Sequence, residues 1–182
     1  QFLSDFGIRA LSKYHEKNPY TEAVGGVEYT IRYDPGDSTS DLFGGNSNWR
    51  GPVWVPINFL IIKSIRHNGK FYGDELQVEC PTGSGNKMNL VKVADELTYR
   101  LIKLFERDET GKRAIHGQHN WFYQRPANED LLLFYEYFHG DNGGGLGASH
   151  QTGWTALVAE LIHTLGGKKP ASSTEPVNQL TG

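Results

Sequence analysis

The 182-residue sequence has a single cysteine, no excess of basic residues and no long apolar run. One cysteine, Cys80, excludes an intrachain disulfide framework and a zinc site built from several cysteines. The 18 basic and 21 acidic residues leave a net charge of −3, without the lysine and arginine clusters that replace phosphate counterions. Apolar stretches such as 59–62 fall far short of the ~20 residues that cross a bilayer. We therefore expect a soluble chain that binds neither nucleic acid nor membrane. Because no signal-peptide pattern opens the sequence, we also expect the chain to be cytoplasmic.

Aromatic residues and glycines, by contrast, are plentiful. Aromatics make up 12% of the chain and glycines number 22. An aromatic face offers the C–H groups of a sugar ring a flat apolar surface, and glycine lets backbone approach a ligand closely. The combination fits a carbohydrate site, although an aromatic-rich core would give the same composition.

Hydrophobic periodicity predicts a mostly helical chain. Apolar residues at helical spacing predict helices, and strict alternation of apolar and polar residues predicts a strand. The clearest helix opens at Gly51-Pro52, because proline suits a first turn, and closes at Asn68-Gly69. The full set of predicted elements is helices over 3–15, 51–69, 90–105 and 149–165, a half-buried strand over 27–33, and an extended or strand segment over 131–138.

The segment 134–147 carries the first candidate for catalysis. Glu136 sits among aromatic residues and precedes a loop dominated by glycine. Apolar surroundings favour the protonated form of a carboxyl group, which suits general acid or base chemistry near neutral pH. An exposed glutamate on the polar face of a strand explains the residue equally well. Asp141 is a rival acid, but Gly-Asp-Asn-Gly is also ordinary turn chemistry, and we favour the turn.

Two further segments carry groups suited to sugar recognition. The segment 44–54 offers amides, a permanently charged planar donor and two indoles, which suit the hydroxyls and ring faces of a sugar. A helix N-terminus with tryptophans that anchor the core is the alternative, and both can hold. The segment 148–154 begins another predicted helix. A metal site at His139, Asp141 and His150 is disfavoured because their spacing matches no recognised ligand pattern.

Three motifs follow one another along the chain. They are Asn48-Trp49-Arg50-Gly51-Pro52-Val53-Trp54, then Phe134-Tyr135-Glu136-Tyr137, then Gly145-Leu146-Gly147-Ala148-Ser149-His150-Gln151-Thr152-Gly153-Trp154. In order and spacing they resemble the C-terminal part of glycoside hydrolase family 63. That family includes processing α-glucosidase I and bacterial relatives that act on α-glucosides and on mannosyl- or glucosyl-glycerate. The resemblance extends over residues 1–165.

The resemblance implies an (α/α)6 barrel that hydrolyses α-linked sugars with inversion and without a metal or other cofactor. In such enzymes one carboxylic acid protonates the leaving oxygen and a second carboxylate activates water. The resemblance places Glu136 at the general base, although Tyr137 stands where many relatives have glutamine. The predicted substrate-binding residues are Asn48, Trp49, Arg50, Trp54, His139, His150 and Trp154.

The general acid of the family lies well upstream of the first motif, and too few residues precede that motif here to reach it. We therefore expect residues 1–165 to be the C-terminal portion of a mainly α, (α/α)6 glycosidase catalytic domain with a short β element. Residues 166–182 are expected to form a flexible tail. Such a portion would expose an apolar flank to a second copy or to the missing N-terminal portion. The alternative is a stand-alone carbohydrate-binding module without catalysis.

Overall fold

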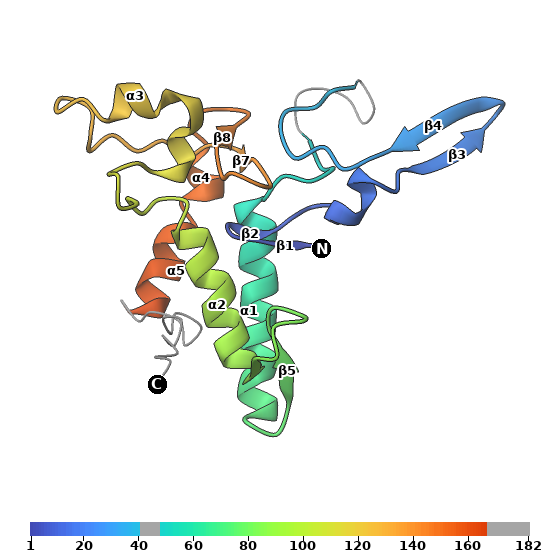
Figure 1. Ribbon diagram of the computed structural model, residues 1–182. Helices are drawn as coiled ribbons and strands as arrows, with labels where there is room; N and C mark the ends of the chain where they lie inside the picture. The colour runs from blue at the N-terminus through green and yellow to red at the C-terminus, as the bar shows by residue number, and fades with distance from the viewer. Residues whose placement is uncertain (41–47, 167–182) are drawn as a thin grey trace, which may run out of the picture.

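The computed structural model describes residues 1–40 and 48–166, which form a helical stem that carries a loop-rich head and a projecting hairpin (Figure 1). The helices are α1 (Val55–Tyr72), α2 (Leu90–Ile102), α3 (Asn120–Tyr123), α4 (Thr152–Thr155) and α5 (Val158–Leu165), with 3-10 helices η1 (Lys13–Glu16) and η2 (Ala114–His119). Strands pair two by two and antiparallel: β1 (Leu3–Ser4) with β2 (Gly7–Ile8), β3 (Tyr20–Val24) with β4 (Val27–Ile31), β5 (Gln77–Glu79) with β6 (Lys87–Asn89), and β7 (Tyr137–Phe138) with β8 (Gly145–Leu146).

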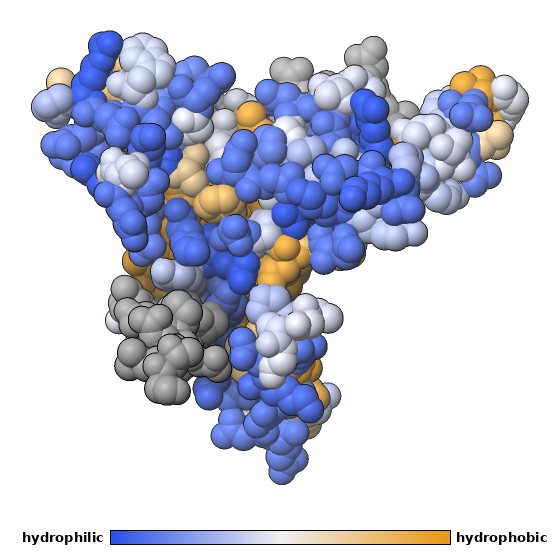
Figure 2. Space-filling model, in the orientation of Figure 1, coloured by the Kyte–Doolittle hydropathy of each residue, from blue (hydrophilic) through white to orange (hydrophobic). Residues whose placement is uncertain are grey.

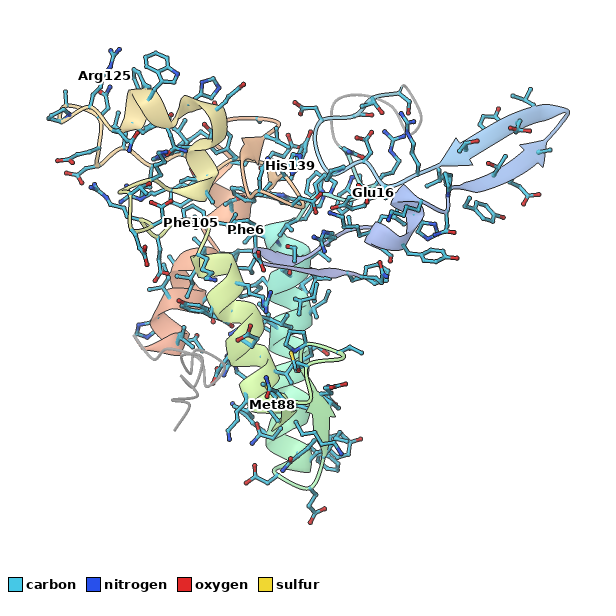
Figure 3. The ribbon with its side chains drawn as sticks, viewed as in Figure 1. Phe6, Glu16, Met88, Phe105, Arg125 and His139 are labelled. Atoms are coloured by element: carbon cyan, nitrogen blue, oxygen red, sulfur yellow. The ribbon has the colours of Figure 1, made fainter. Side chains whose placement is uncertain are left out.

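The stem is built by α1 and α2, which pack along each other with α5 beside α2 (Figure 1). The apolar face of α2 provides much of this core, because Val93, Leu97 and Leu101 are buried, as is Leu104 just after the helix. Phe6 and Phe105 pack against the same cluster near the junction of stem and head (Figure 3). The two helices predicted from hydrophobic periodicity over 51–69 and 90–105 are thus confirmed as α1 and α2.

Helix α1 runs beyond its predicted end because Gly69 lies inside it. A Cβ at Gly69 would lie 2.8 Å from the backbone nitrogen of Val91, so glycine here lets α1 approach the start of α2 closely. The helix ends instead at Gly73, which has a φ of 57°. The prediction of a helix C-terminus at Asn68-Gly69 was therefore wrong by one turn.

Three other predicted elements differ from the structure. The helix over 3–15 is wrong, because Gly7 has a φ of 126° and turns β1 back on β2. The helix over 149–165 is two helices, α4 and α5, and begins only at Thr152. The strand over 27–33 is confirmed as β4, but it is largely exposed because it pairs with β3 in a hairpin that leaves the body of the molecule (Figure 1).

The prediction of an (α/α)6 barrel is wrong for the residues that the structure describes. They form one pair of long helices, short helical turns and four separate two-stranded sheets, so the chain is an α+β arrangement and not a ring of paired helices. The motif segments fold mostly as loops and two-residue strands, with the short helix α4 in the third, and their backbone groups pair across the head. Most of the predicted tail, residues 167–182, lies outside the described residues.

The visible surface is largely hydrophilic, with apolar residues showing where head and stem meet (Figure 2). On α1, Ile57 is 41% exposed and Leu60 is 63% exposed, whereas the apolar face of α2 is covered. Self-association through α1 stays a prediction. Within the described part of the chain, no helix combines the length and apolarity needed to span a membrane.

Candidate functional site

The three sequence motifs meet in the head, at the N-terminal end of α1. Val53 and Phe138 exchange backbone hydrogen bonds of 2.8 and 2.9 Å, and Val53 also forms a β-bridge to Arg9. The backbone N–H of Glu136 donates to the carbonyl oxygen of Ala148 at 2.9 Å. Segments far apart in the sequence are therefore joined through their backbones, and the strand β7, which Glu136 directly precedes, lies at their centre.

A cavity of about 900 Å³ opens beside this strand, and Glu136 lies in its wall. The remaining walls come from Tyr135, from residues 37–38, from Gln118–His119 on η2, and from residues 145–149. Glu136 is partly buried, and its Oε2 accepts a hydrogen bond of 3.0 Å from the backbone N–H of Ala148. This contact fixes the direction of the carboxylate. The residue predicted to be catalytic thus faces a space large enough for a sugar ring.

Gly147 has no side chain that would clash with the carboxylate of Glu136. Its φ is +70°, and a Cβ there would lie 2.7 Å from Glu136 Oε2 and 2.6 Å from the ring of Tyr137. A Cβ at Gly153 on α4, in contrast, would have no atom within 4 Å. The two glycines of one sequence motif therefore have different roles, one required by the site and one replaceable.

We expect Gly147→Ala to destabilise the fold by about 1–2 kcal/mol, the usual cost of a left-handed backbone with a Cβ, before any displacement of Glu136 is counted. Gly153→Ala is the matched control, and it should be neutral or stabilising by up to about 1 kcal/mol because alanine favours helix. Urea unfolding of both variants measures the difference. Equal stabilities for the two variants would contradict this account of Gly147.

Four aromatic residues form an aromatic cluster, which consists of Trp49, Trp54, Tyr137 and Trp154. It is linked to the cavity wall by the hydrogen bond from the Tyr137 hydroxyl to Asp37. Trp54 is buried and stacks between Trp49, at 4.0 Å between ring centroids, and Tyr137, at 4.7 Å. Trp154 meets Trp54 edge to face at 6.3 Å. Trp49 is 46% exposed and Trp154 is 37% exposed. The cluster therefore presents two indoles to solvent on a support that the core holds, as stacking against a sugar requires.

Asn48 and Arg50 are buried, and both hold the loop of residues 34–40. The Arg50 guanidinium donates to Asp34 Oδ2 at 3.4 Å, Ser38 Oγ at 2.8 Å and Ser40 Oγ at 2.7 Å. The Asn48 amide donates to two carbonyl oxygens of the same loop, at 2.6 and 2.9 Å, and its Oδ1 accepts from the backbone of Arg50 at 3.0 Å. These contacts position a loop that lines the cavity. Direct sugar binding by Asn48 and Arg50 stays a prediction.

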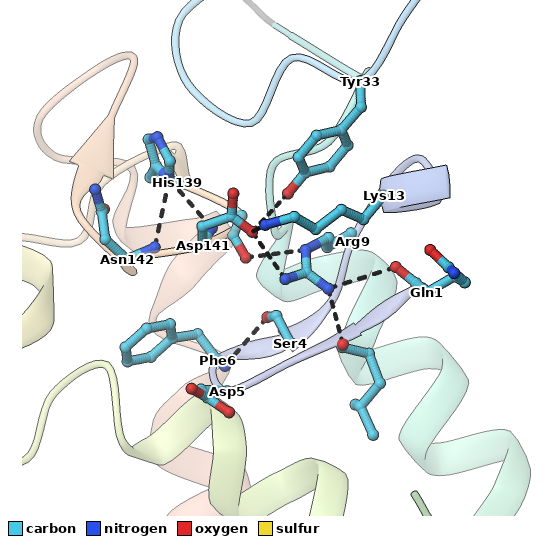
Figure 4. Close-up of polar contacts among 12 residues, drawn as sticks. Gln1, Ser4, Asp5, Phe6, Arg9, Lys13, Tyr33, His139, Asp141 and Asn142 are labelled. Carbon is cyan, nitrogen blue, oxygen red and sulfur yellow. Dashed lines mark hydrogen bonds and ion pairs between the residues drawn. The ribbon is translucent and has the colours of Figure 1, made fainter. Parts of the chain in front are cut away.

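His139 shapes the loop that follows β7 (Figure 4). Its Nδ1 accepts hydrogen bonds from the backbone N–H groups of Asp141, at 3.1 Å, and Asn142, at 3.4 Å. Burial lowers the pKa of His139 more than nearby Asp141 raises it, so the ring is neutral at pH 7. His150 lies further away in the chain, exposed before α4, and its ring lies 5.8 Å from that of Phe134. Substrate contacts by both histidines stay predictions.

Asp141 is an anchor for the N-terminal residues (Figure 4). Its Oδ1 accepts hydrogen bonds from Arg9, at 2.8 Å, and from the Tyr33 hydroxyl, at 2.9 Å, and pairs with Lys13 at 3.1 Å. Burial raises the pKa of Asp141, but the hydrogen bonds from Lys13, Arg9 and Tyr33 outweigh it and hold the pKa below its ordinary value. A carboxylate that is held by two cations and lies outside the cavity wall is a poor candidate for the acid.

We expect Asp141→Asn to lower the free energy of unfolding at pH 7 by about 1–3 kcal/mol, because charge-assisted hydrogen bonds are lost. The folded pKa is depressed, so the carboxylate stabilises the fold above its unfolded pKa and stops doing so as pH falls through the folded value. Urea unfolding should show a constant gap between the two proteins above about pH 5, and a shrinking gap below about pH 4. A gap independent of pH would show that Asp141 acts without its charge.

Sequence reasoning missed four residues of the cavity wall: Asp37, Ser38, Gln118 and His119. These residues lie outside the three motifs: Asp37 and Ser38 precede the first motif, and Gln118 and His119 lie between the first and the second. Asp37 is identified by its hydrogen bond with Tyr137, which lies 100 positions away in the sequence. No local sequence pattern can contain such a contact.

The sequence is similar to those of known glucosidases. No family model matches it. An uncharacterized protein of Saccharomyces cerevisiae is 56% identical over 168 residues, which cover 91% of this chain and 15% of that protein. The mannosyl-oligosaccharide glucosidase of S. cerevisiae is 29% identical over 124 residues, 67% of this chain and 12% of that enzyme. A probable mannosyl-oligosaccharide glucosidase of Schizosaccharomyces pombe is 26% identical over 129 residues, 69% of this chain and 12% of that protein.

The chain thus spans only 12% to 15% of the length of these curated relatives. Two of the three are named as mannosyl-oligosaccharide glucosidases, and the similarity to them is distant and partial. The comparisons therefore support a coarse relationship of this chain to glycoside hydrolases that act on carbohydrate.

Proposed function

We propose that this chain is part of the catalytic unit of an inverting α-glycosidase of glycoside hydrolase family 63, and that Glu136 is its general base. The observation that carries the proposal is the position of Glu136, in the wall of a cavity of about 900 Å³ with one carboxylate oxygen held by the Ala148 backbone. Similarity to mannosyl-oligosaccharide glucosidases supports the same chemistry. The substrates we propose are α-linked glucosides or glycosyl-glycerates.

Each part of the site has a role in such a reaction. A carboxylate fixed in direction can take a proton from a water molecule that attacks the anomeric carbon. The exposed indoles of Trp49 and Trp154 can stack on sugar rings next to the cavity, and the buried Trp54 keeps them in place. Inversion also requires an acid that protonates the leaving oxygen, and we propose that a segment outside this chain supplies it.

Turnover of α-glucosides by the longer polypeptide that contains this chain tests the proposal. We expect release of free glucose from α-linked disaccharides and none from the matching β-linked disaccharides, which serve as the control. Binding of the same sugars without hydrolysis would instead favour a carbohydrate-binding module, in which the aromatic cluster acts alone. Absence of both binding and hydrolysis would contradict a carbohydrate function for this site.

A further inference from the structure

We propose that Asp37 is a substrate-binding residue that accepts hydrogen bonds from hydroxyl groups of a neutral sugar ring in the Glu136 cavity, with Tyr137 as its positioning residue. The inference rests on the proposed function, because it assigns a second contact and a substrate class to the same cavity. It adds a residue that lies outside all three sequence motifs.

Asp37 and Glu136 bring two carboxylates to one cavity from distant parts of the chain. Asp37 lies on the exposed loop 34–40, and its Oδ1 accepts a hydrogen bond of 3.1 Å from the Tyr137 hydroxyl. Among residues 1–40 and 48–166, the structure gives Asp37 no cationic partner. This distinguishes it from Asp34 on the same loop, which pairs with Arg50 at 3.4 Å. Oδ2 of Asp37 can therefore accept hydrogen bonds from a ligand.

Tyr137 is a rigid donor to this carboxylate. Its ring is completely buried and stacks on Trp54, and it follows Glu136 directly in the chain. Burial, and then the hydrogen bond to Asp37, raise the pKa of Tyr137 well above its ordinary value, so the phenol keeps its proton and donates at every physiological pH. Both cavity carboxylates are thus oriented by hydrogen bonds: Glu136 by the backbone N–H of Ala148, and Asp37 by the Tyr137 hydroxyl.

The loop that carries Asp37 is held from its other side. Arg50 donates to two serine hydroxyls of the loop, and Asn48 donates to two of its carbonyl oxygens. Because these bonds order the loop in the absence of a ligand, little conformational entropy is lost when a sugar binds. Asn48 and Arg50 therefore act on the cavity through the position of Asp37.

The two carboxylates in the wall of the Glu136 cavity determine which charge a bound ligand can carry. An ionised carboxylate forms strong hydrogen bonds with hydroxyl donors, and two such groups in one cavity repel a further anion. A neutral hexose ring supplies several hydroxyl donors, whereas the ring of a uronate or a sugar phosphate would bring a like charge into the cavity. We therefore assign the ring bound in this cavity to the neutral sugars.

The test compares three single variants in the longer polypeptide. We expect Asp37→Asn to raise KM for an α-glucoside by at least about 10-fold while kcat changes less, because a hydrogen bond to a charged acceptor is lost. Tyr137→Phe should raise KM by a smaller factor, and the double variant should be no worse than Asp37→Asn alone. Glu28→Gln, on the exposed β4 strand away from the cavity, is the matched control and should leave both constants unchanged.

Deoxy substrates separate a direct contact from a change in structure. A substrate that lacks the hydroxyl bound by Asp37 should have a raised KM with the parent protein. With Asp37→Asn, the loss of that hydroxyl should have little further effect. Unchanged KM and Kd in Asp37→Asn, with α-glucosides still hydrolysed, would overturn this inference and leave the proposed function standing. If sugars bind without hydrolysis, the proposed function fails and the Kd of Asp37→Asn for glucose decides on Asp37. Absence of any sugar binding overturns both.

Discussion

Glu136→Gln is expected to lower kcat of the longer polypeptide for α-glucosides by at least about 100-fold while KM stays within a few-fold of its original value. Glutamine keeps the shape of the side chain and can still accept a hydrogen bond from Ala148, but it cannot take a proton from water. Because the base acts on water and not on the aglycone, the loss should be similar for good and poor leaving groups. Steady-state kinetics with a series of aryl α-glucosides measures both effects.

Asp141→Asn is the control for this experiment. Asp141 is the other carboxylate of the segment 134–147, but it pairs with Arg9 and Lys13 away from the cavity wall. It should lower stability and leave kcat nearly unchanged under folding conditions. Near-normal turnover in Glu136→Gln together with loss of turnover in Asp141→Asn would show that the base has been assigned to the wrong carboxylate.

The isolated chain should hydrolyse no unactivated α-glucoside at a measurable rate. Under the proposed function the acid lies on another segment, and general acid catalysis contributes typically ~10²–10⁴-fold to departure of a poor leaving group. Glucosyl fluoride is the informative exception, because fluoride departs with little need for protonation. Release of glucose and of fluoride from parallel assays, with the longer polypeptide as the positive control, measures the contrast. Robust hydrolysis of maltose by the isolated chain would contradict the assignment of the acid to another segment.

The helices of the stem could be predicted because their signal is local. Val93, Leu97 and Leu101 recur at helical spacing and are buried on one face of α2, so periodicity and packing agree. The segment 3–15 shows a similar spacing but contains Gly7, whose positive φ makes a turn between β1 and β2. There the backbone conformation of one glycine outweighs the apolar pattern.

The prediction of an (α/α)6 barrel came from the resemblance to a family and not from the hydrophobic periodicity of this sequence. The sequence alone therefore offered no test of it. Only two long helices, α1 and α2, have the patterns that a ring of paired helices needs, and the structure of the described residues shows an α+β arrangement. A fold assigned by resemblance to longer proteins therefore has to be checked element by element.

The candidate site was predicted only where its chemistry lies in one sequence motif. Glu136 stands in such a motif, and the structure places it in a cavity wall. Asn48 and Arg50 were selected for their hydrogen-bonding groups, but those groups are engaged with loop 34–40, which sequence spacing does not reveal. Asp37 acquires its position through Tyr137, and only the folded chain brings these residues together.

The stereochemistry of the first product tests the central claim most directly. Proton NMR during the first minutes of hydrolysis of an α-glucoside by the longer polypeptide reports the anomer released before mutarotation. A general base at Glu136 predicts β-glucose first, and added azide should not restore turnover to Glu136→Gln. Release of α-glucose, or rescue of Glu136→Gln by azide with formation of a glucosyl azide, would contradict the account and make Glu136 a nucleophile.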